Sequence, residues 1–156
     1  MHAKGVKTMS EKSVATQRAT ARTSLKAQDV MQQPVIAATP RASLRDVATQ
    51  LVVNEFSGMP VADADGRVVG VITEADIVRA LNEGKRLENL TAGSVMTGPA
   101  ITVDVETPIE DVMKSLEEHR IVRLPVTSQG KLVGIIARRD VIRAVLEPEF
   151  MAFGEL

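Results

Sequence analysis

Few side chains in this chain are of the types that carry out covalent or acid–base chemistry. The sequence contains no cysteine, and its only histidines are His2 and His119. The phosphate-binding GxxxxGK, esterase GxSxG and metal-binding HExxH patterns are absent from it. Neighbouring carboxylates such as Asp63 and Asp65 fall in a predicted turn, where a solvated role is favoured over catalysis. We therefore expect a protein that is not an enzyme and has neither a catalytic cofactor nor a metal site.

The composition indicates one globular domain with an apolar core. Of the 156 residues, 44% are hydrophobic and 25% are charged. No apolar run approaches the length of a membrane span, and no N-terminal stretch resembles a secretory signal. Because the chain also lacks cysteine, which is compatible with a reducing compartment, we expect a cytoplasmic protein that does not contact a membrane.

Charge is unevenly distributed along the chain. Residues 1–27 carry six basic side chains against Glu11 alone, a net charge of +5, so the remainder carries −6 within the total of −1. An acidic body is unlike a nucleic-acid-binding surface, and no nucleic-acid partner is expected. The basic segment is rich in Ser, Thr and Ala, which predicts a flexible N-terminal arm over residues 1–27. A transit peptide and an anion-binding arm are the alternatives.

The sequence contains an internal repeat. The stretch VMQQPVIAATPRASLRDVATQL, from Val30, aligns with VMTGPAITVDVETPIEDVMKSL, from Val95, at a constant offset of 65 residues. After a one-residue deletion in a turn, Asp76 aligns with Asp140 at an offset of 64. Such a repeat predicts two copies of one unit, packed as a pseudo-symmetric pair with pockets at their shared boundary.

Both copies predict the same elements in the same order. Short apolar runs indicate first strands over residues 34–39 and 99–103. Apolar residues then recur at helical spacing over residues 43–56 and 107–120. Each of these helices opens with a hydroxyl residue that can cap it, Ser43 or Thr107.

The second half of each copy predicts a hairpin and a closing helix. MPVAD and LPVTS turn at DADGR and SQGK onto the strands RVVGVI and KLVGII. The closing helices are expected to begin near Glu74 and Arg138. The unit is therefore strand, helix, strand, strand, helix, and the fold class is α+β.

These residues resemble a known family. The order of elements, the MPV and LPV strands and the segments GVITEAD and GIIARRD are similar to paired CBS domains, also called a Bateman module. The resemblance implies two tandem βαββα repeats packed with pseudo-two-fold symmetry, over residues 28–82 and 93–146, followed by a C-terminal tail over 147–156. It also implies two clefts that bind adenosine-containing ligands such as AMP, ADP, ATP, NAD or S-adenosylmethionine. Such modules usually sense and regulate, so we expect a stand-alone regulatory module that acts through an unidentified partner protein.

The resemblance assigns roles to individual residues. In the family, an acidic residue at the start of the closing helix binds the ribose hydroxyls, and Asp76 and Asp140 occupy that position. Thr73 supplies the hydroxyl that the motif expects, whereas its counterpart Ala137 does not. An arginine before the LPV strand faces the phosphates in the family, and only the second copy supplies one, Arg123.

Carried over to the tandem packing, these positions define two unequal clefts. The better cleft is expected to combine Thr73, Asp76, Met96, Ile101, Val122 and Arg123. The other is expected to combine Arg138, Arg139 and Asp140 with Met31, Ile36, Ser57 and Gly58. Structural roles remain open for several of these residues, namely helix capping for Asp76 and Asp140, core packing for Met31, Ile36, Met96 and Ile101, and surface ion pairs for Arg138 and Arg139. Since the only rings are three phenylalanines, adenine is expected to rest on aliphatic walls and backbone amides.

Assembly and two other functions complete the expectations. CBS pairs commonly form flat dimers through helices away from the clefts, and the tail contains Phe150, Met151 and Phe153 without a place in either repeat. We expect a homodimer with this tail near the subunit boundary. A ligand-free dimeric scaffold that docks a partner protein is the alternative function, and nucleic-acid binding by the basic arm is a third.

Overall fold

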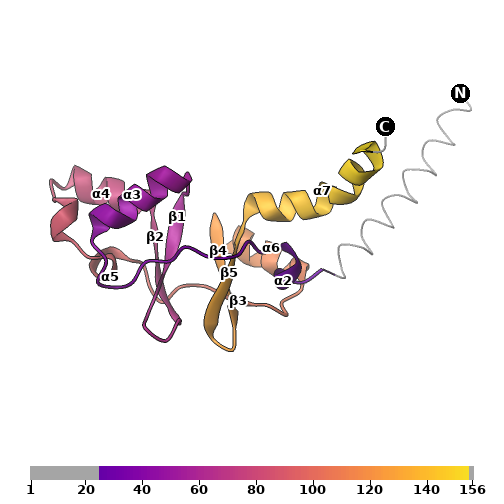
Figure 1. Ribbon diagram of the computed structural model, residues 1–156, viewed down its shortest axis with the longest axis horizontal. Coiled ribbons are helices and arrows are strands. Elements are labelled where there is room, and N and C mark those ends of the chain that lie inside the picture. Colours follow the sequence, from indigo (N-terminus) through magenta and orange to yellow (C-terminus); the bar gives the residue numbers. More distant parts are fainter. Residues whose placement is uncertain (1–24, 155–156) are drawn as a thin grey trace, which may run out of the picture.

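The computed structural model describes residues 25–154, so residues 1–24 of the predicted arm lie outside the described part. Two similar units lie side by side (Figure 1). The first contains α3 (Leu44–Asn54), β1 (Gly58–Ala62), β2 (Val68–Thr73) and α4 (Glu74–Asn82). The second contains β3 (Val103–Asp104), α6 (Ile109–Glu118), β4 (Arg123–Ser128), β5 (Lys131–Ala137) and α7 (Arg138–Gly154). The short helices α2 (Ala27–Val30), η1 (Leu87–Asn89) and α5 (Ala92–Val95) lie in the connecting segments.

The predicted α+β class and the two-repeat organisation are confirmed. In each repeat the central strands form an antiparallel hairpin, β1 with β2 and β4 with β5. The closing helices begin at Glu74 and Arg138, as the sequence predicts. Each hairpin ends directly at a helix N-terminus, so the residues that link strand to helix are held by both elements.

The predicted first strands are wrong in extent. Residues 34–39 form no strand, and only Ala38 makes a single parallel bridge to Val61. In the second repeat β3 covers Val103–Asp104, at the end of the predicted run rather than along it. Both runs begin at a proline, which has no N–H to donate to a sheet. The segments therefore run beside the hairpins with few backbone hydrogen bonds.

One of the two predicted helix caps is confirmed. The Ser43 hydroxyl accepts a hydrogen bond from the backbone N–H of Asp46 at 3.3 Å, at the start of α3. Thr107 is not a cap, because α6 begins one residue later with Pro108 in the N-cap position. The Thr107 hydroxyl instead accepts from the backbone N–H of Asp104 at 3.1 Å and stabilises the turn before the helix.

Each repeat has its own apolar core, and a short helix from a connecting segment packs into each core. Ala27 of α2 is completely buried in the core of the second repeat, next to β5 and α7. Ala92 of α5 is completely buried in the core of the first repeat. In Figure 1 the start of the described chain accordingly lies beside α6 and α7, and α5 lies beside the first hairpin. This exchange ties the two repeats together.

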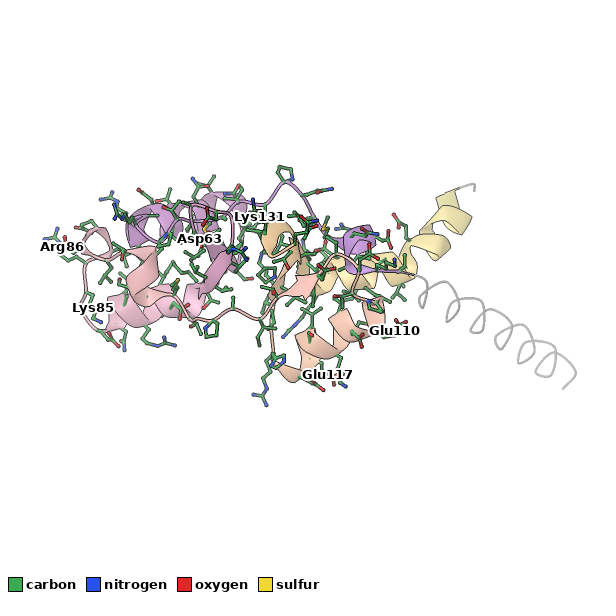
Figure 2. All side chains as sticks on the ribbon, turned by 90° about the horizontal axis from the view of Figure 1, so that it is seen from below. Asp63, Lys85, Arg86, Glu110, Glu117 and Lys131 are labelled. Atoms are coloured by element: carbon green, nitrogen blue, oxygen red, sulfur yellow. The ribbon has the colours of Figure 1, made fainter. Side chains whose placement is uncertain are left out.

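The turns of the two hairpins also contact each other. The backbone N–H of Leu132 donates a hydrogen bond to the carbonyl oxygen of Gly66 at 2.9 Å. Asp63 and Lys131 mark the two turns in Figure 2. The two strand pairs thus lie against each other along one boundary.

The C-terminal tail continues α7 through Gly154. The side chains of Phe150, Met151 and Phe153, expected at a subunit boundary, lie outside the described side chains. No helix within residues 25–154 has the length and apolar character needed to cross a membrane.

Candidate functional site

The junction of β2 and α4 fixes a buried carboxylate. Asp76 is 5% exposed, and its Oδ2 accepts hydrogen bonds from the backbone N–H of Thr73 at 2.9 Å and from the Thr73 hydroxyl at 3.1 Å. In return, the Thr73 hydroxyl accepts from the Asp76 N–H at 3.4 Å, which completes a capping box. Among the described groups, the other oxygen, Asp76 Oδ1, contacts only the exposed Arg79, at 3.3 Å. A carboxylate accepts about four hydrogen bonds, so Oδ1 retains capacity for donors from a ligand.

A cavity of about 600 Å³ lies beside this carboxylate, between the two repeats. This volume is in the range of small-molecule sites, about 300–1,000 Å³. Its polar lining comes from both repeats: Ser57, Thr73, Glu74, Asp76, Thr97, His119, Arg120 and Arg123. Its remaining lining is apolar or small: Gly58, Val71, Ala75, Pro99, Ala100, Ile101, Ile121, Val122 and Pro125.

The apolar wall is aliphatic. Ile101 and Val122 are 39% and 47% exposed, which is high for large apolar side chains in the middle of a molecule, and both face this cavity. Covering them with a flat apolar group would remove this surface from water. No Phe, Tyr or Trp side chain contributes to the lining, and His119 supplies its only ring of the aromatic type.

The cationic side of the cavity follows the end of α6. Arg120 adopts a left-handed conformation, φ 51°, and the backbone N–H of Ile121 donates to the Leu116 carbonyl at 3.0 Å. This turn directs residues 119–123 along the cavity. His119, Arg120 and Arg123 thereby line the cavity from the second repeat, whereas Asp76 comes from the first.

Arg123 is the central cation of the site. Its guanidinium carbon lies 4.4 Å from the centre of the Phe56 ring, a cation–π arrangement. Its Nε is buried and has no hydrogen-bond partner among the described residues. Burial lowers the pKa of Arg123, while the negative charge of Asp140 raises it. Arginine remains charged in proteins, so an incompletely paired cation borders the cavity and favours an anionic ligand.

The structure brings together most of the residues expected in the better cleft. Thr73, Asp76, Ile101, Val122 and Arg123 all line one cavity. Met96 does not: its sulfur lies over Gly70, where a Cβ would come within 2.6 Å of it, and it packs against the first core. Met31 lies over Gly134 in the same way and packs against the second core. The core role left open for both methionines is the one that the structure supports.

Two residues expected in the second cleft lie in the first. Ser57 and Gly58 line the cavity of Asp76, so their assignment to the other cleft is wrong. The reason is the hairpin register: Gly58 pairs with Thr73, and the Ser57 carbonyl accepts from the Glu74 N–H at 2.9 Å. The start of β1 is therefore fixed next to the start of α4.

The other residues expected in the second cleft are not brought into this cavity. Asp140 is 4% exposed, and its Oδ2 accepts from the Ala137 N–H at 2.7 Å. Arg138 Nε donates to the Ile121 carbonyl at 3.3 Å, and its side chain borders a groove between α6 and α7. Arg139 and Ile36 are exposed.

Several cavity residues were not expected from the sequence. Arg120 and His119 have the character of surface residues at a helix end, and only the turn after α6 directs them to the cavity. Thr97 lies at the edge of β2, where it exchanges two backbone hydrogen bonds of 3.0 Å with Val71. Its alignment with Gln32 in the repeat was the available signal.

Comparison with known proteins identifies the fold and several related structures. The family model of the CBS domain matches the chain twice, over residues 27–83 and 92–147. Hypoxic response protein 1 of Mycobacterium tuberculosis is 29% identical over 128 residues, which cover 81% of this chain and 90% of that protein. Its crystal structure, with two coordinated zinc ions, has a TM-score of 0.71, 28% identity, and coverage of 76% and 98%. Within residues 25–154 here, no cluster of three or more His, Cys, Asp or Glu side chains is arranged to hold a metal ion.

Two further structures contain adenosine derivatives. CBSX2, solved in complex with AMP, is 31% identical with a TM-score of 0.72, and the match covers 80% of this chain and 98% of that one. The CBS domain pair of protein MJ0100, solved with 5′-methylthioadenosine and S-adenosyl-L-methionine, is 28% identical with a TM-score of 0.68. That match covers 76% of this chain and 94% of the other.

Proposed function

Since this chain belongs to the CBS domain family and contains two copies of the domain, we propose that it is a regulatory module that binds an adenosine-containing nucleotide. The site is the cavity between the repeats that contains Asp76 and Arg123. The chain holds this ligand without transforming it, and the bound and free states are read by a partner protein.

The observation that carries the proposal is the chemistry of one cavity. A ribose presents two neighbouring hydroxyls, and Asp76 offers a fixed carboxylate oxygen to accept from them. Ile101 and Val122 offer aliphatic surface for a base. Arg123 lines the same cavity and offers its guanidinium cation for a phosphate. Related CBS proteins bind AMP, 5′-methylthioadenosine and S-adenosyl-L-methionine, which supports the same ligand class here.

The distribution of charge in the lining favours a phosphate-bearing ligand. The two arginines, Arg120 and Arg123, come from the second repeat, whereas the two carboxylates, Asp76 and Glu74, come from the first. AMP, ADP, ATP and NAD place phosphates against such cations. S-adenosylmethionine brings a positively charged sulfonium instead. We therefore rank the phosphate-bearing nucleotides above S-adenosylmethionine.

A ligand panel tests the function. Isothermal titration and thermal-shift measurements with AMP, ADP, ATP, NAD, S-adenosylmethionine and adenosine are expected to show saturable binding and a raised Tm for at least one nucleotide. Mass spectrometry of small molecules that copurify with the chain identifies the natural occupant. Failure of every adenosine compound to bind would contradict the proposal.

Exposed apolar side chains support a homodimer and favour the scaffold as the second candidate function. Val52 and Val53 on α3 are 78% and 70% exposed, and Val78 and Leu81 on the adjacent α4 are also exposed. Ile142 of α7, the repeat equivalent of Val78, is exposed as well. We propose that these helix faces pair with a second copy. In a ligand-free scaffold the same dimer would form while the cavity bound no nucleotide, so the ligand panel separates the two functions.

A further inference from the structure

The two repeats present their acids in similar local frames, apart from the Thr73 hydroxyl, which has no counterpart at Ala137. Asp76 and Asp140 each accept from the backbone N–H three residues earlier, at 2.9 and 2.7 Å. Each also lies near an arginine three residues later, Arg79 at 3.3 Å and Arg143 at 3.6 Å. The hydrogen bonding of the second carboxylate oxygen, Oδ1, therefore depends on which residue of the other repeat faces each acid.

Gln32 faces Asp140. Its side-chain Nε2 donates to Asp140 Oδ1 at 2.6 Å, a short bond from an amide to a carboxylate. Its backbone is fixed at the edge of β5, because its N–H donates to the Ile135 carbonyl at 2.8 Å and its carbonyl accepts from the Ile135 N–H at 3.1 Å. The oxygen that corresponds to the ligand acceptor of Asp76 is thus already occupied by the chain itself.

Thr97 holds the equivalent position in the first cleft. It exchanges backbone hydrogen bonds of 3.0 Å with Val71 at the edge of β2, as Gln32 does with Ile135 at β5. Its side chain is shorter than that of glutamine, and among the described contacts it makes no hydrogen bond to Asp76. The backbone geometry is the same in both places, and only the side chain differs.

We propose that Gln32 occupies the acceptor oxygen of Asp140 in the second cleft, so that each chain binds one nucleotide, in the cleft of Asp76. Gln32 is the residue that sets this stoichiometry. The inference rests on the proposed function, since it concerns the same class of ligand.

Exchanging the two equivalent residues tests the proposal. The probe is AMP, or the nucleotide that binds most tightly in the panel, titrated calorimetrically into the full chain. The parent is expected to bind one equivalent. Gln32→Thr frees Asp140 Oδ1 and is expected to add a second site. Thr97→Gln places an amide against Asp76 and is expected to weaken binding to the first cleft about tenfold or more, the effect of competing with one hydrogen bond to a charged group.

Each outcome has a defined meaning. Circular dichroism and Tm must first show that both variants fold as the parent does, and Gln32→Ala provides a second variant that removes the amide if Gln32→Thr is unstable. The proposal stands if both substitutions respond as described. Two equivalents bound by the parent, no second site after either substitution of Gln32, or parental affinity in Thr97→Gln would overturn it. A parent that binds no nucleotide contradicts the proposed function itself, which distinguishes the two failures.

Discussion

Asp76 and Arg123 are proposed to recognise different parts of the ligand. Asp76 is held by the capping box of α4, so its carboxylate is fixed before a ligand arrives. Among the described contacts, the Arg123 guanidinium lies over the Phe56 ring, and its buried Nε has no hydrogen-bond partner. The first residue is expected to act on the ribose and the second on the phosphate.

Asp76→Ala tests the ribose contact. The substitution removes the acceptor and is expected to cost about 1.5–3 kcal/mol of binding free energy, the value of a hydrogen bond to a charged group. Asp140→Ala is the matched variant, since its carboxylate has a similar local frame and already accepts from Gln32. It is expected to change AMP affinity less. Calorimetric titration that showed equal losses, or a loss only for Asp140→Ala, would reverse the ranking of the clefts.

Arg123→Ala tests the phosphate contact. The variant is expected to bind AMP and ATP more weakly while binding adenosine as the parent does, because only the nucleotides offer phosphate oxygens. The dependence of AMP affinity on salt is also expected to flatten. Arg86→Ala is the control, since Arg86 is exposed, pairs with Glu88 and lies at the far end of the first repeat (Figure 2). Unchanged AMP affinity in Arg123→Ala would assign the phosphate to other side chains.

Some of these residues could be predicted from the sequence and others could not. Thr73, Asp76 and Arg123 belong to motifs that fix both residue type and position, and the structure brings all three to one cavity. The bond from Gln32 to Asp140 joins residues 108 positions apart. It depends on the register at the edge of β5 and on side-chain length, so the repeat alignment alone does not reveal it.

Close packing against the first hairpin positions one wall of the cavity. Gly70 of β2 faces Met96, and the segment after Met96 carries Thr97 and Pro99 to the cavity. The glycine is needed because a Cβ there would lie 2.6 Å from the Met96 sulfur and 2.9 Å from the Thr97 carbonyl oxygen. The segment that supplies one wall of the cavity thus lies directly on the hairpin that supplies the other.

Gly70→Ala tests this contact. Overpacking of this kind is expected to lower the free energy of unfolding by about 1–3 kcal/mol, as measured by urea denaturation. Arg45→Ala, on the exposed side of α3, serves as the control and is expected to change it by less than about 0.5 kcal/mol. A free energy of unfolding equal to that of the parent in Gly70→Ala would contradict this expectation, because it would show that the Met96 segment can shift away from the hairpin at no cost.

The helices were more predictable than the short segments between them. α3 and α6 bury single apolar stripes at helical spacing, for example Leu44, Val47 and Leu51 of α3. α2 and α5 have four residues each, which is too short for a period to be recognised. Their exchange between the cores was therefore not expected, and neither was the near absence of a first strand.

At the scale of the whole molecule, the two repeats leave apolar helix faces in water. Val52, Val53, Val78 and Leu81 lie on two adjacent helices, and such clusters mark interaction surfaces more often than isolated apolar residues do. A second copy of the chain offers the same faces, as an isologous dimer requires.

Val53→Glu tests the dimer. A charge buried without a partner at an interface is costly, so the variant is expected to shift the molecule toward the monomer in light scattering at micromolar concentration. Lys131→Glu changes charge at the turn between β4 and β5, which lies away from α3 and α4 (Figure 1), and is expected to leave the dimer intact. A parent chain that scattered as a monomer under the same conditions would contradict the dimer itself.

The central claim is that the cavity between the repeats holds a nucleotide by its ribose at Asp76. A crystal structure of the chain grown with saturating AMP tests it most directly. We expect one nucleotide per chain, with its ribose hydroxyls within hydrogen-bond distance of the Asp76 carboxylate, its base against Ile101 and Val122, and its phosphate toward Arg123. An unoccupied cavity at saturating AMP, or a nucleotide bound away from Asp76, would contradict the account.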